Sequence, residues 1–458
     1  MSLNILREEV DLFHIRQAVT ELTEQVKVAG DSDVRVTQPV SAGSIALIDW
    51  LNTQPLFPKF YWYSRNGEEE VAALGQICTF SEPEPAYALI SDEQRIWGGR
   101  AFDGHTGKNP DFPSAFFFLP QIELFRQGEQ WMLAVNLGEK REDALQALAS
   151  LLPAEPLPVP IEACIHSVSH TPDFSGWQSL LEDALQRIEN NAFKKVVLAR
   201  QSTVVPDRPV SAAQLLKTSM ISNRDSFHFM LAIKPGSSFI GSTPERLYLR
   251  DGLSLETEAL AGTIGRGSDA RQDQELADWL VHDEKNLTEN QFVVDDIIDC
   301  LNPYADVIDV EAEAHLVCLR KVQHLKRKIH ACLKPGINGV HLLAALQPTA
   351  AVAGLPRAAA LAYILDKEPF PRGWYAGSMG YISHQKAQIC VAIRSAEVSD
   401  GLIRLYAGAG ILPGSDAEFE WQELDRKMST LLSLLKETAD KERVSVEGNT
   451  VMQENKQP

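Results

Sequence analysis

The sequence predicts an α+β protein in which antiparallel sheets are covered by helices, and three observations carry that prediction. Residues 380–410 have the alternation of strands, with "QICVAIRSA" and "LIRLYAGAG" joined through the turn "SDG". Long segments of helical periodicity stand between strand-like segments. The chain has no G-x-G-x-x-G, no GK[ST] and no H-E-x-x-H, so the usual signatures of nucleotide-binding parallel sheets and of zinc hydrolases are missing.

Length and charge narrow the function classes. A chain of 458 residues is too long for one simple core, so we expect one composite domain or two that share a sheet. The net charge is −19 and the basic residues are scattered, which argues against nucleic acid and anionic membranes as partners. The six cysteines form no C-x-x-C, and no segment approaches eighteen apolar residues. We therefore expect a soluble, cytoplasmic protein with reduced cysteines.

The chain divides into four parts. Residues 1–155 contain a helical pattern over the first 28 residues, the strand-like "KFYWYSR" and "WMLAVNL", and a helix ending near "ALASLL". Residues 156–165 belong to a proline-rich connector. Residues 166–436 are dense in motifs, and residues 437–458 are polar and low in aromatics, which predicts a disordered tail.

Residues 193–200, "FKKVVLAR", place two lysines at the start of an apolar strand. Side chains alternate faces on a strand, so one of Lys194 and Lys195 points inward. The stretch fits an edge strand whose lysines reach water along their stems. It also fits a buried lysine, because burial lowers the pKa of an ammonium and can leave an amine that accepts a proton near pH 7.

The segment "GSDAEFEWQELDRKMSTLLSLLK" predicts a helix. Ser415 has the spacing of a capping box, and an apolar stripe begins at Phe419. Glu420 and Glu423 lie one turn apart, with Lys427 one turn beyond. These charges fit a solvated face with an ion pair, and they equally fit a carboxylate pair for a hard divalent cation.

A second helical segment, "DWLVHDEKNLTENQFVVDDII", has an apolar stripe that runs from Leu280 through Leu287 and Val294 to Leu301. Glu289 lies away from this stripe. Most such glutamates are only solvated. A magnesium ion, however, needs few protein carboxylates, because it keeps waters and takes oxygens from its substrate, so two glutamates from separate helices suffice.

Other segments could bind an anion or donate a proton. Cys390, Ala392, Arg394 and Ala396 would share one strand face, where small neighbours leave room for a carboxylate on the guanidinium. The glycines of "YAGAG" and "ALAGT" would let backbone N–H groups approach an anion, although such runs also serve tight turns. Glu245 in "FIGSTPERLYL" follows a strand and a proline turn, and would be an exposed loop residue or an acid aimed into a cleft.

Nine motifs, in the order in which they occur along the chain, resemble those of the chorismate-utilising enzymes. Within that family they most resemble the isochorismate synthases of the menaquinone pathway. They lie within about residues 166–436 and read "KVVLAR", "GSTPERL", "ETEALAGT", "LTENQFVVDDI", "RKVQHL", "LQPTAAVAGLPR", "WYAGSMGYIS", "RLYAGAGI" and "EFEWQELDRK". The resemblance implies two packed antiparallel sheets with helices outside, a magnesium ion and the dianionic substrate chorismate. The implied reaction adds water at C2 of the ring while the C4 hydroxyl departs.

The resemblance also implies roles for single residues. Lys195 matches the general base and Glu245 the general acid, while Glu289 and Glu423 match the magnesium ligands and Glu420 contacts the ion through water. The positions that match the substrate-binding residues are Gly262, Thr263, His324, Tyr375, Arg394, Gly408, Ala409, Gly410 and Lys427.

The resemblance narrows the activity within the family. Lys195 together with Ala261 implies water rather than ammonia as nucleophile, so no amidotransferase subunit is expected, and we expect a monomer or weak homodimer. Gln347 and the alanines of "TAAVAG" resemble the menaquinone branch, whereas Arg426 stands where relatives usually have asparagine. A salicylate synthase, an isochorismate synthase of a siderophore pathway and a chorismate-binding regulatory protein remain as alternatives.

Overall fold

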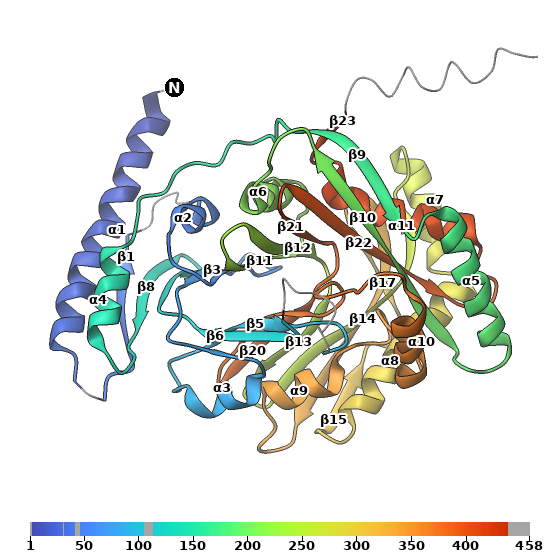
Figure 1. Cartoon of the computed structure of the whole chain (residues 1–458). Coiled ribbons are helices and arrows are strands. Elements are labelled where there is room, and N and C mark those ends of the chain that lie inside the picture. The colour runs from blue at the N-terminus through green and yellow to red at the C-terminus, as the bar shows by residue number, and fades with distance from the viewer. Residues whose placement is uncertain (1, 31, 42–45, 105–112, 438–458) are drawn as a thin grey trace, which may run out of the picture.

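The computed structural model describes residues 2–30, 32–41, 46–104 and 113–437. In these residues two large sheets pack together, and the helices lie on their outer sides and at their ends (Figure 1). Their strands pair antiparallel, apart from one short parallel pair between β9 and β23. The predicted α+β class with two packed antiparallel sheets is therefore confirmed.

The first sheet has thirteen strands within the described residues, and it includes the strand that carries the lysine pair. In spatial order it runs β1 (Arg35–Val40), β8 (Gln130–Asn136), β7 (Ile122–Gln127), β3 (Glu69–Leu74), β2 (Lys59–Tyr63), β11 (Phe227–Lys234), β12 (Ser237–Thr243), β21 (Ser395–Ser399), β22 (Leu402–Ile411), β10 (Lys195–Pro206), β9 (Cys164–Thr171) and β23 (Lys436–Glu437), with β18 (Gly354–Leu355) beside β10. The strand β10 is therefore internal, which excludes the edge-strand interpretation of "FKKVVLAR".

The second sheet has ten strands within the described residues, and its strands β14 and β17 carry several of the predicted site residues. Its order is β15 (Ala305–Val310), β17 (Val322–Leu333), β14 (Ser254–Gly265), β13 (Arg246–Asp251), β20 (Lys386–Val391), β19 (Ser378–Ile382), β5 (Ile96–Arg100), β6 (Ala115–Leu119) and β4 (Cys78–Phe80), with β16 (His315–Cys318) beside β17. Strands from before and after the proline-rich connector thus share both sheets.

The helices cover the outer sides of the two sheets (Figure 1). They are α1 (Ser2–Val28), α2 (Leu47–Thr53), α3 (Pro83–Leu89), α4 (Arg141–Ala149), α5 (Phe174–Glu189), α6 (Ala212–Ser222), α7 (Ala270–Leu280), α8 (Glu284–Leu301), α9 (Gly339–Leu346), α10 (Arg357–Lys367) and α11 (Ala417–Leu432). The N-terminal helix, the strands β2 and β8 and the helix α4 lie where the sequence predicts them. No helix in the described residues is long and apolar enough to cross a membrane.

The structure confirms the turn of the predicted meander but not its first strand. Asp400 and Gly401 have φ values of 52° and 76°, as a two-residue hairpin turn between β21 and β22 requires. "QICVAIRSA", however, is two strands, because β20 belongs to the second sheet and β21 to the first. Arg394 lies at the crossing with φ 50°, so it is not on a common strand face with Cys390.

Two helix predictions also need correction. Asp416, not Ser415, caps α11, since its side chain accepts from the backbone N–H groups of Glu418 and Phe419. Phe419 is 71% exposed and lies outside the buried stripe.

The stripe predicted from Leu280 to Leu301 spans two helices. The helix α7 ends at Leu280, and Asp283 caps the new helix α8. Leu287 is 38% exposed, while Val294 and Leu301 are buried. Glu437, the first residue of the predicted tail, pairs with β9, and the rest of that tail lies outside the described residues.

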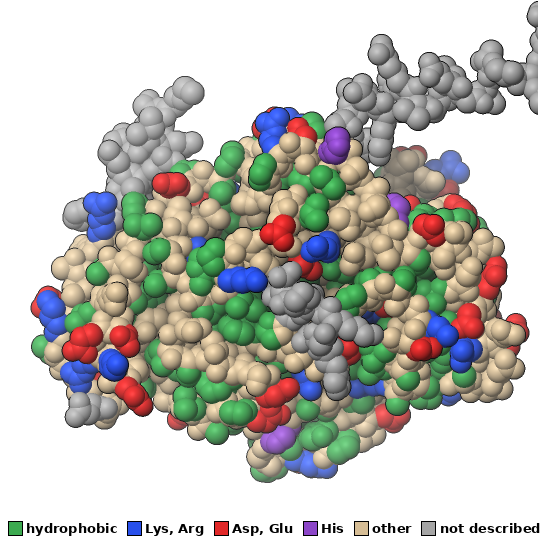
Figure 2. All heavy atoms as spheres, viewed as in Figure 1, with side chains coloured by type: hydrophobic (Ala, Val, Ile, Leu, Met, Phe, Trp, Pro, Cys, Tyr) green, Lys and Arg blue, Asp and Glu red, His purple; other side chains and the backbone are tan. Residues whose placement is uncertain are grey.

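The largest apolar cluster of the described residues draws on both sheets and on the helices packed against them, and it joins residues from both sides of the connector. It includes Phe117 from β6, Trp177 from α5, Leu198 from β10 and Ile389 from β20. On the face shown in Figure 2, acidic and basic side chains are interspersed and form no large patch of one sign. The predicted boundaries of the four chain parts remain predictions.

Candidate active site

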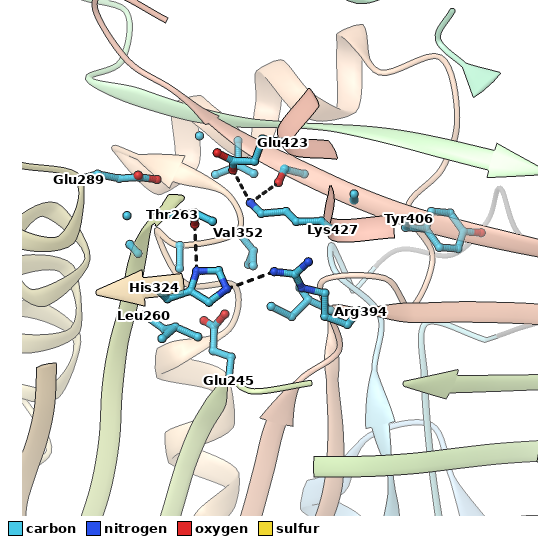
Figure 3. A pocket seen from close by; sticks show the side chains of 18 of the residues that line it. Glu245, Leu260, Thr263, Glu289, His324, Val352, Arg394, Tyr406, Glu423 and Lys427 are labelled. Atoms are coloured by element: carbon cyan, nitrogen blue, oxygen red, sulfur yellow. Dashed lines mark hydrogen bonds and ion pairs between the residues drawn. The ribbon is translucent and has the colours of Figure 1, made fainter. Parts of the chain in front are cut away.

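A cavity lies where the two sheets meet, and both sheets contribute residues to its walls (Figure 3). Strands β10 and β22 contribute Val197, Tyr406 and two glycines, while β14 and β17 contribute Leu260, Thr263 and His324. The helices α8 and α11 close it with acidic and basic side chains. The predicted site residues that line it are Glu245, Gly262, Thr263, Glu289, His324, Tyr375, Arg394, Gly408, Gly410, Glu423 and Lys427.

Three predicted residues are not part of the lining: Lys195, Ala409 and Glu420. Lys195 is fully buried and Lys194 is exposed, as the strand alternation allows. The Nζ atom of Lys195 lies 2.9 Å from Oε1 of Glu289, which itself lines the cavity. The buried lysine therefore stands directly behind a cavity carboxylate.

Gly410 makes room for this ion pair. It faces Val197 across the β10–β22 ladder. A Cβ atom at this position would lie 2.4 Å from Oε1 of Glu289 and 3.1 Å from Cε of Lys195. Any side chain would displace the pair, so the glycine is required by close packing against it.

Glu245 lies between β12 and β13 and is only 4% exposed. Burial, and next the negative charge of Glu258, raise the pKa of the Glu245 carboxyl to about 8, while Lys195, Lys427 and Arg394 act in the opposite direction. At neutral pH this carboxyl is therefore protonated. Figure 3 shows it below His324, across the cavity from Glu289 and Glu423.

Each of the three glutamates assigned to a cation is paired with a lysine. Burial would raise the pKa of Glu289, but Lys195, together with Lys427 and Lys285, outweighs it and holds that pKa below the usual value. Lys427 Nζ lies 2.6 Å from Oε1 of Glu423 and donates to the carbonyl oxygen of Gly408 at 2.8 Å.

The third glutamate, Glu420, has a raised pKa, first because of burial and next because of the charge of Glu423, and Lys285 donates to it at 3.1 Å. Within the described parts of the chain, no three His, Cys, Asp or Glu side chains form a group that could hold a metal by themselves. The carboxylates fit magnesium by donor type, since that ion takes few protein oxygens and fills its shell with water and substrate.

Arg394, His324 and Thr263 form a hydrogen-bonded row along one wall (Figure 3). Burial and the nearby Arg394 and Lys427 hold the pKa of His324 well below its usual value, so its ring is neutral. Arg394 donates from Nη2 to His324 Nε2 at 3.2 Å, so the other ring nitrogen, Nδ1, donates to Thr263 Oγ1 at 2.9 Å. Nη1 of Arg394 is buried without a hydrogen-bond partner, which leaves a donor for an anion.

Tyrosine rings close the side of the cavity next to the glycine strand. Tyr375 stacks on Tyr406 with ring centroids 5.2 Å apart. A Cβ at Gly408 would lie 2.8 Å from the Tyr375 hydroxyl, so the glycine lets that hydroxyl approach the backbone. Burial raises the pKa of Tyr375, so its hydroxyl stays a proton donor.

Sequence reasoning missed several residues near the cavity. Tyr406 lines it, and it stands in the quoted motif "RLYAGAGI" two residues before Gly408, so strand alternation places it on the same face as Gly408 and Gly410. Gln347 does not line the cavity, because its amide donates to the carbonyls of Arg100 and Ala101 and accepts from Ser378.

Comparisons with known proteins agree with this geometry. The family model described as "Chorismate binding enzyme" matches residues 21–436, which is most of the chain. This protein belongs to the chorismate binding enzymes. Among their members, it is 41% identical to the isochorismate synthase MenF of Escherichia coli K12 over 85% of this chain and 90% of that protein. It is 38% identical to the isochorismate synthase MenF of Pasteurella multocida over 89% and 94%.

A solved structure gives the same result for the fold. The menaquinone-specific isochorismate synthase MenF from Escherichia coli superimposes with a TM-score of 0.84 at 38% identity, covering 92% of this chain and all of that one. The resemblance to the chorismate-utilising family is therefore confirmed, and it extends through the N-terminal part of the chain as well as the motif-rich part.

Proposed function

We propose that this protein is an isochorismate synthase, a magnesium-dependent isomerase that converts chorismate to isochorismate for menaquinone biosynthesis. The observation that carries the proposal is the cavity itself, which has a buried lysine behind one wall and a protonated glutamic acid in the opposite wall. Relatives named isochorismate synthase match along nearly their whole length, which supports the same assignment.

The reaction needs a base and an acid at separate ring positions. Lys195 takes a proton from water, whose oxygen bonds to C2 of the ring. The ring double bonds shift, and the C4 hydroxyl leaves as water after Glu245 donates its proton. Burial keeps Glu245 protonated at neutral pH, so it can act as the acid without a prior proton uptake.

Magnesium would be held by Glu289 and Glu423, with Glu420 in contact through water. When bound, the ion neutralises negative charge and orients a substrate carboxylate. The ion would then take over the neutralisation of these two glutamates, so the ammonium of Lys427 would be free for the substrate and Lys195 would no longer need its proton to balance the charge of Glu289. The base role of Lys195 requires this loss of the proton.

The remaining residues bind and orient the dianionic substrate. Arg394 and Lys427 supply positive charge, and Arg394 has a free buried N–H group to offer. Tyr375, Thr263 and the neutral ring of His324 supply hydrogen bonds, while the backbone at Gly262, Gly408 and Gly410 allows close approach, with Ala409 between the last two on β22. In a protein of net charge −19, this local cluster compensates repulsion of the substrate.

The finer assignments are part of the same proposal. We place the enzyme in the cytoplasm as a monomer or weak homodimer without an amidotransferase subunit. A siderophore-pathway isochorismate synthase would carry out the same chemistry. A salicylate synthase would go on to eliminate pyruvate, and a regulatory protein would bind chorismate without turnover.

Product analysis tests the proposal. Purified protein is incubated with chorismate and magnesium, beside the Lys195→Ala and Glu289→Gln variants, and products are separated by chromatography. We expect isochorismate to accumulate with the wild type and to be absent with both variants. Salicylate with pyruvate would move the protein to the neighbouring activity, and unchanged chorismate from a folded wild type would overturn the enzymatic assignment.

A further inference from the structure

Arg65 is a residue of the N-terminal part of the chain that reaches the proposed acid. It lies just after β2, outside the cavity lining. Its Nη1 atom donates to the carbonyl oxygen of Pro244 at 2.6 Å and also to Oε1 of Glu258. Its Nη2 atom donates to Oε2 of Glu258 at 2.9 Å, so the guanidinium binds both carboxylate oxygens. Pro244 is the residue immediately before Glu245.

Glu258, on β14, holds the other side of the same short segment. Its Oε1 accepts from the backbone N–H of Arg246 at 2.9 Å. Arg246 is the residue immediately after Glu245, so the ion pair of Arg65 and Glu258 is bonded to the backbone on both sides of the acid. Glu258 is 5% exposed, and Lys326 Nζ stands 3.7 Å from its carboxylate. These hydrogen bonds hold the backbone on both sides of Glu245, and so they fix the position from which its side chain extends.

The pair also places a charge beside the acid. Glu258 is anionic, because Arg65 and Lys326 outweigh burial and hold its pKa low. Its negative charge is, after burial, the largest cause that raises the pKa of Glu245. The other charged or titratable groups that face Glu245 are Lys195 on β10, Lys427 on α11, Arg394 after β20, His324 on β17, Tyr375 before β19 and Cys390 on β20.

We propose that Arg65 and Glu258 are positioning residues for catalysis. They hold the backbone around Glu245 in place and keep its carboxyl group able to donate a proton. Neither touches the cavity, and both act through Glu245. The inference rests on the proposed function and gives the N-terminal part of the chain a catalytic task beyond packing, because Arg65 comes from the loop between β2 and β3.

The test uses opposite charge changes at the two ends of one ion pair. Glu258→Gln keeps the shape of the side chain and its acceptor for Arg246, but removes the negative charge. The pKa of Glu245 then falls, and the alkaline limb of the kcat/KM profile moves down by roughly one pH unit. Arg65→Met removes the positive charge that compensates Glu258, so the pKa of Glu245 rises and the alkaline limb moves to higher pH.

Two further variants make the result decisive. Arg65→Lys keeps the charge but cannot hold Pro244 and both carboxylate oxygens together, so it should restore the wild-type pH limb and recover kcat only in part. Arg126→Met is the matched control, since Arg126 contacts carbonyls of two N-terminal loops and pairs with Glu70, away from the cavity lining. Its pH limb should stay at the wild-type value. Thermal unfolding checks that each variant is folded.

The inference would be overturned if the folded Arg65 and Glu258 variants keep the wild-type alkaline limb, or if both variants shift that limb in the same direction. Failure of the proposed function is recognised separately. In that case wild-type protein forms no isochorismate, whereas failure of this inference leaves wild-type turnover intact and only the variant profiles disagree.

Discussion

Glu245 and Glu289 are the same residue type in the same cavity, and their pKa values shift in opposite directions. Lys195 lies 2.9 Å from Glu289 and holds the pKa of Glu289 low against burial. Within the described residues no cation is within ion-pairing distance of Glu245, and burial with the charge of Glu258 raises its pKa to about 8. Burial alone therefore does not decide protonation, and the nearest charge does.

This difference separates two chemical roles across the cavity. The wall with Glu289 and Glu423 offers ionised oxygens, each neutralised by a lysine, which suits a divalent cation. The wall with Glu245 offers a neutral acid, which suits proton donation. The predictions below test these roles in order of expected effect.

Removal of the metal should have the largest effect. Treatment with a chelator should bring isochorismate formation below detection, and added magnesium should restore it, because the ionised Glu289 and Glu423 would lack the cation that orients the substrate. Chromatographic product analysis measures both states. Undiminished turnover in metal-free buffer would mean that these carboxylates serve another purpose.

Lys195→Ala should lower kcat by about 10³-fold or more, since it removes the proposed base. The neighbouring Lys194→Ala is the matched control, because Lys194 is exposed and its ammonium lies 6.0 Å above the ring of Phe292. That control should change kcat by less than about twofold. Equal losses in the two variants, measured by steady-state kinetics, would contradict the separation of the two lysines.

Glu245→Gln should lower kcat by about 10²-fold or more, and it should also change how stability depends on pH. The folded pKa of about 8 lies above the unfolded value, so the folded protein binds more protons between these pKa values, and its stability falls as pH rises through that window. The Glu245→Gln variant has no carboxyl group at this position, so it does not lose stability in this way. Urea unfolding at pH 9 should find it more stable than wild type by roughly 2–4 kcal/mol, with the difference shrinking toward pH 5. An equal difference at both pH values would show that Glu245 is ionised in the fold.

Gly410→Ala should have the smallest effect, lowering kcat by about tenfold, since the added Cβ would displace the Lys195–Glu289 pair without opening the fold. Gly138→Ala is its control, because a Cβ there would meet only Ile77 at 3.4 Å. Kinetics with thermal unfolding separates the two. A Gly410→Ala enzyme with wild-type kcat would show that the pair tolerates displacement.

Local sequence patterns predicted the elements that carry the site. Alternation along "FKKVVLAR" required one inward lysine, and the structure buries Lys195 and exposes Lys194. Helical periodicity placed Glu423 and Lys427 one turn apart, where they form an ion pair. These predictions succeed because they depend only on the geometry of one strand or one helix.

Predictions that needed distant partners were wrong or absent. Arg394 was expected on a continuous strand, but the chain passes from one sheet to the other there, and period-2 patterning is the same on either sheet. The stripe from Leu280 was expected to be one helix, but Asp283 caps a second one. Arg65 and Glu258 carried no local signal, because they are 193 positions apart in sequence.

The sequence by itself determined the fold class, the family, and the identity and order of the motif residues, since these follow from periodicity and from motifs that are contiguous in the chain. Only the tertiary structure decided that Glu289 has Lys195 beside it and that Glu245 has the carboxylate of Glu258 nearby. A protonation state depends on burial and on the nearest charges, and both are set by segments that meet only when the two sheets pack together.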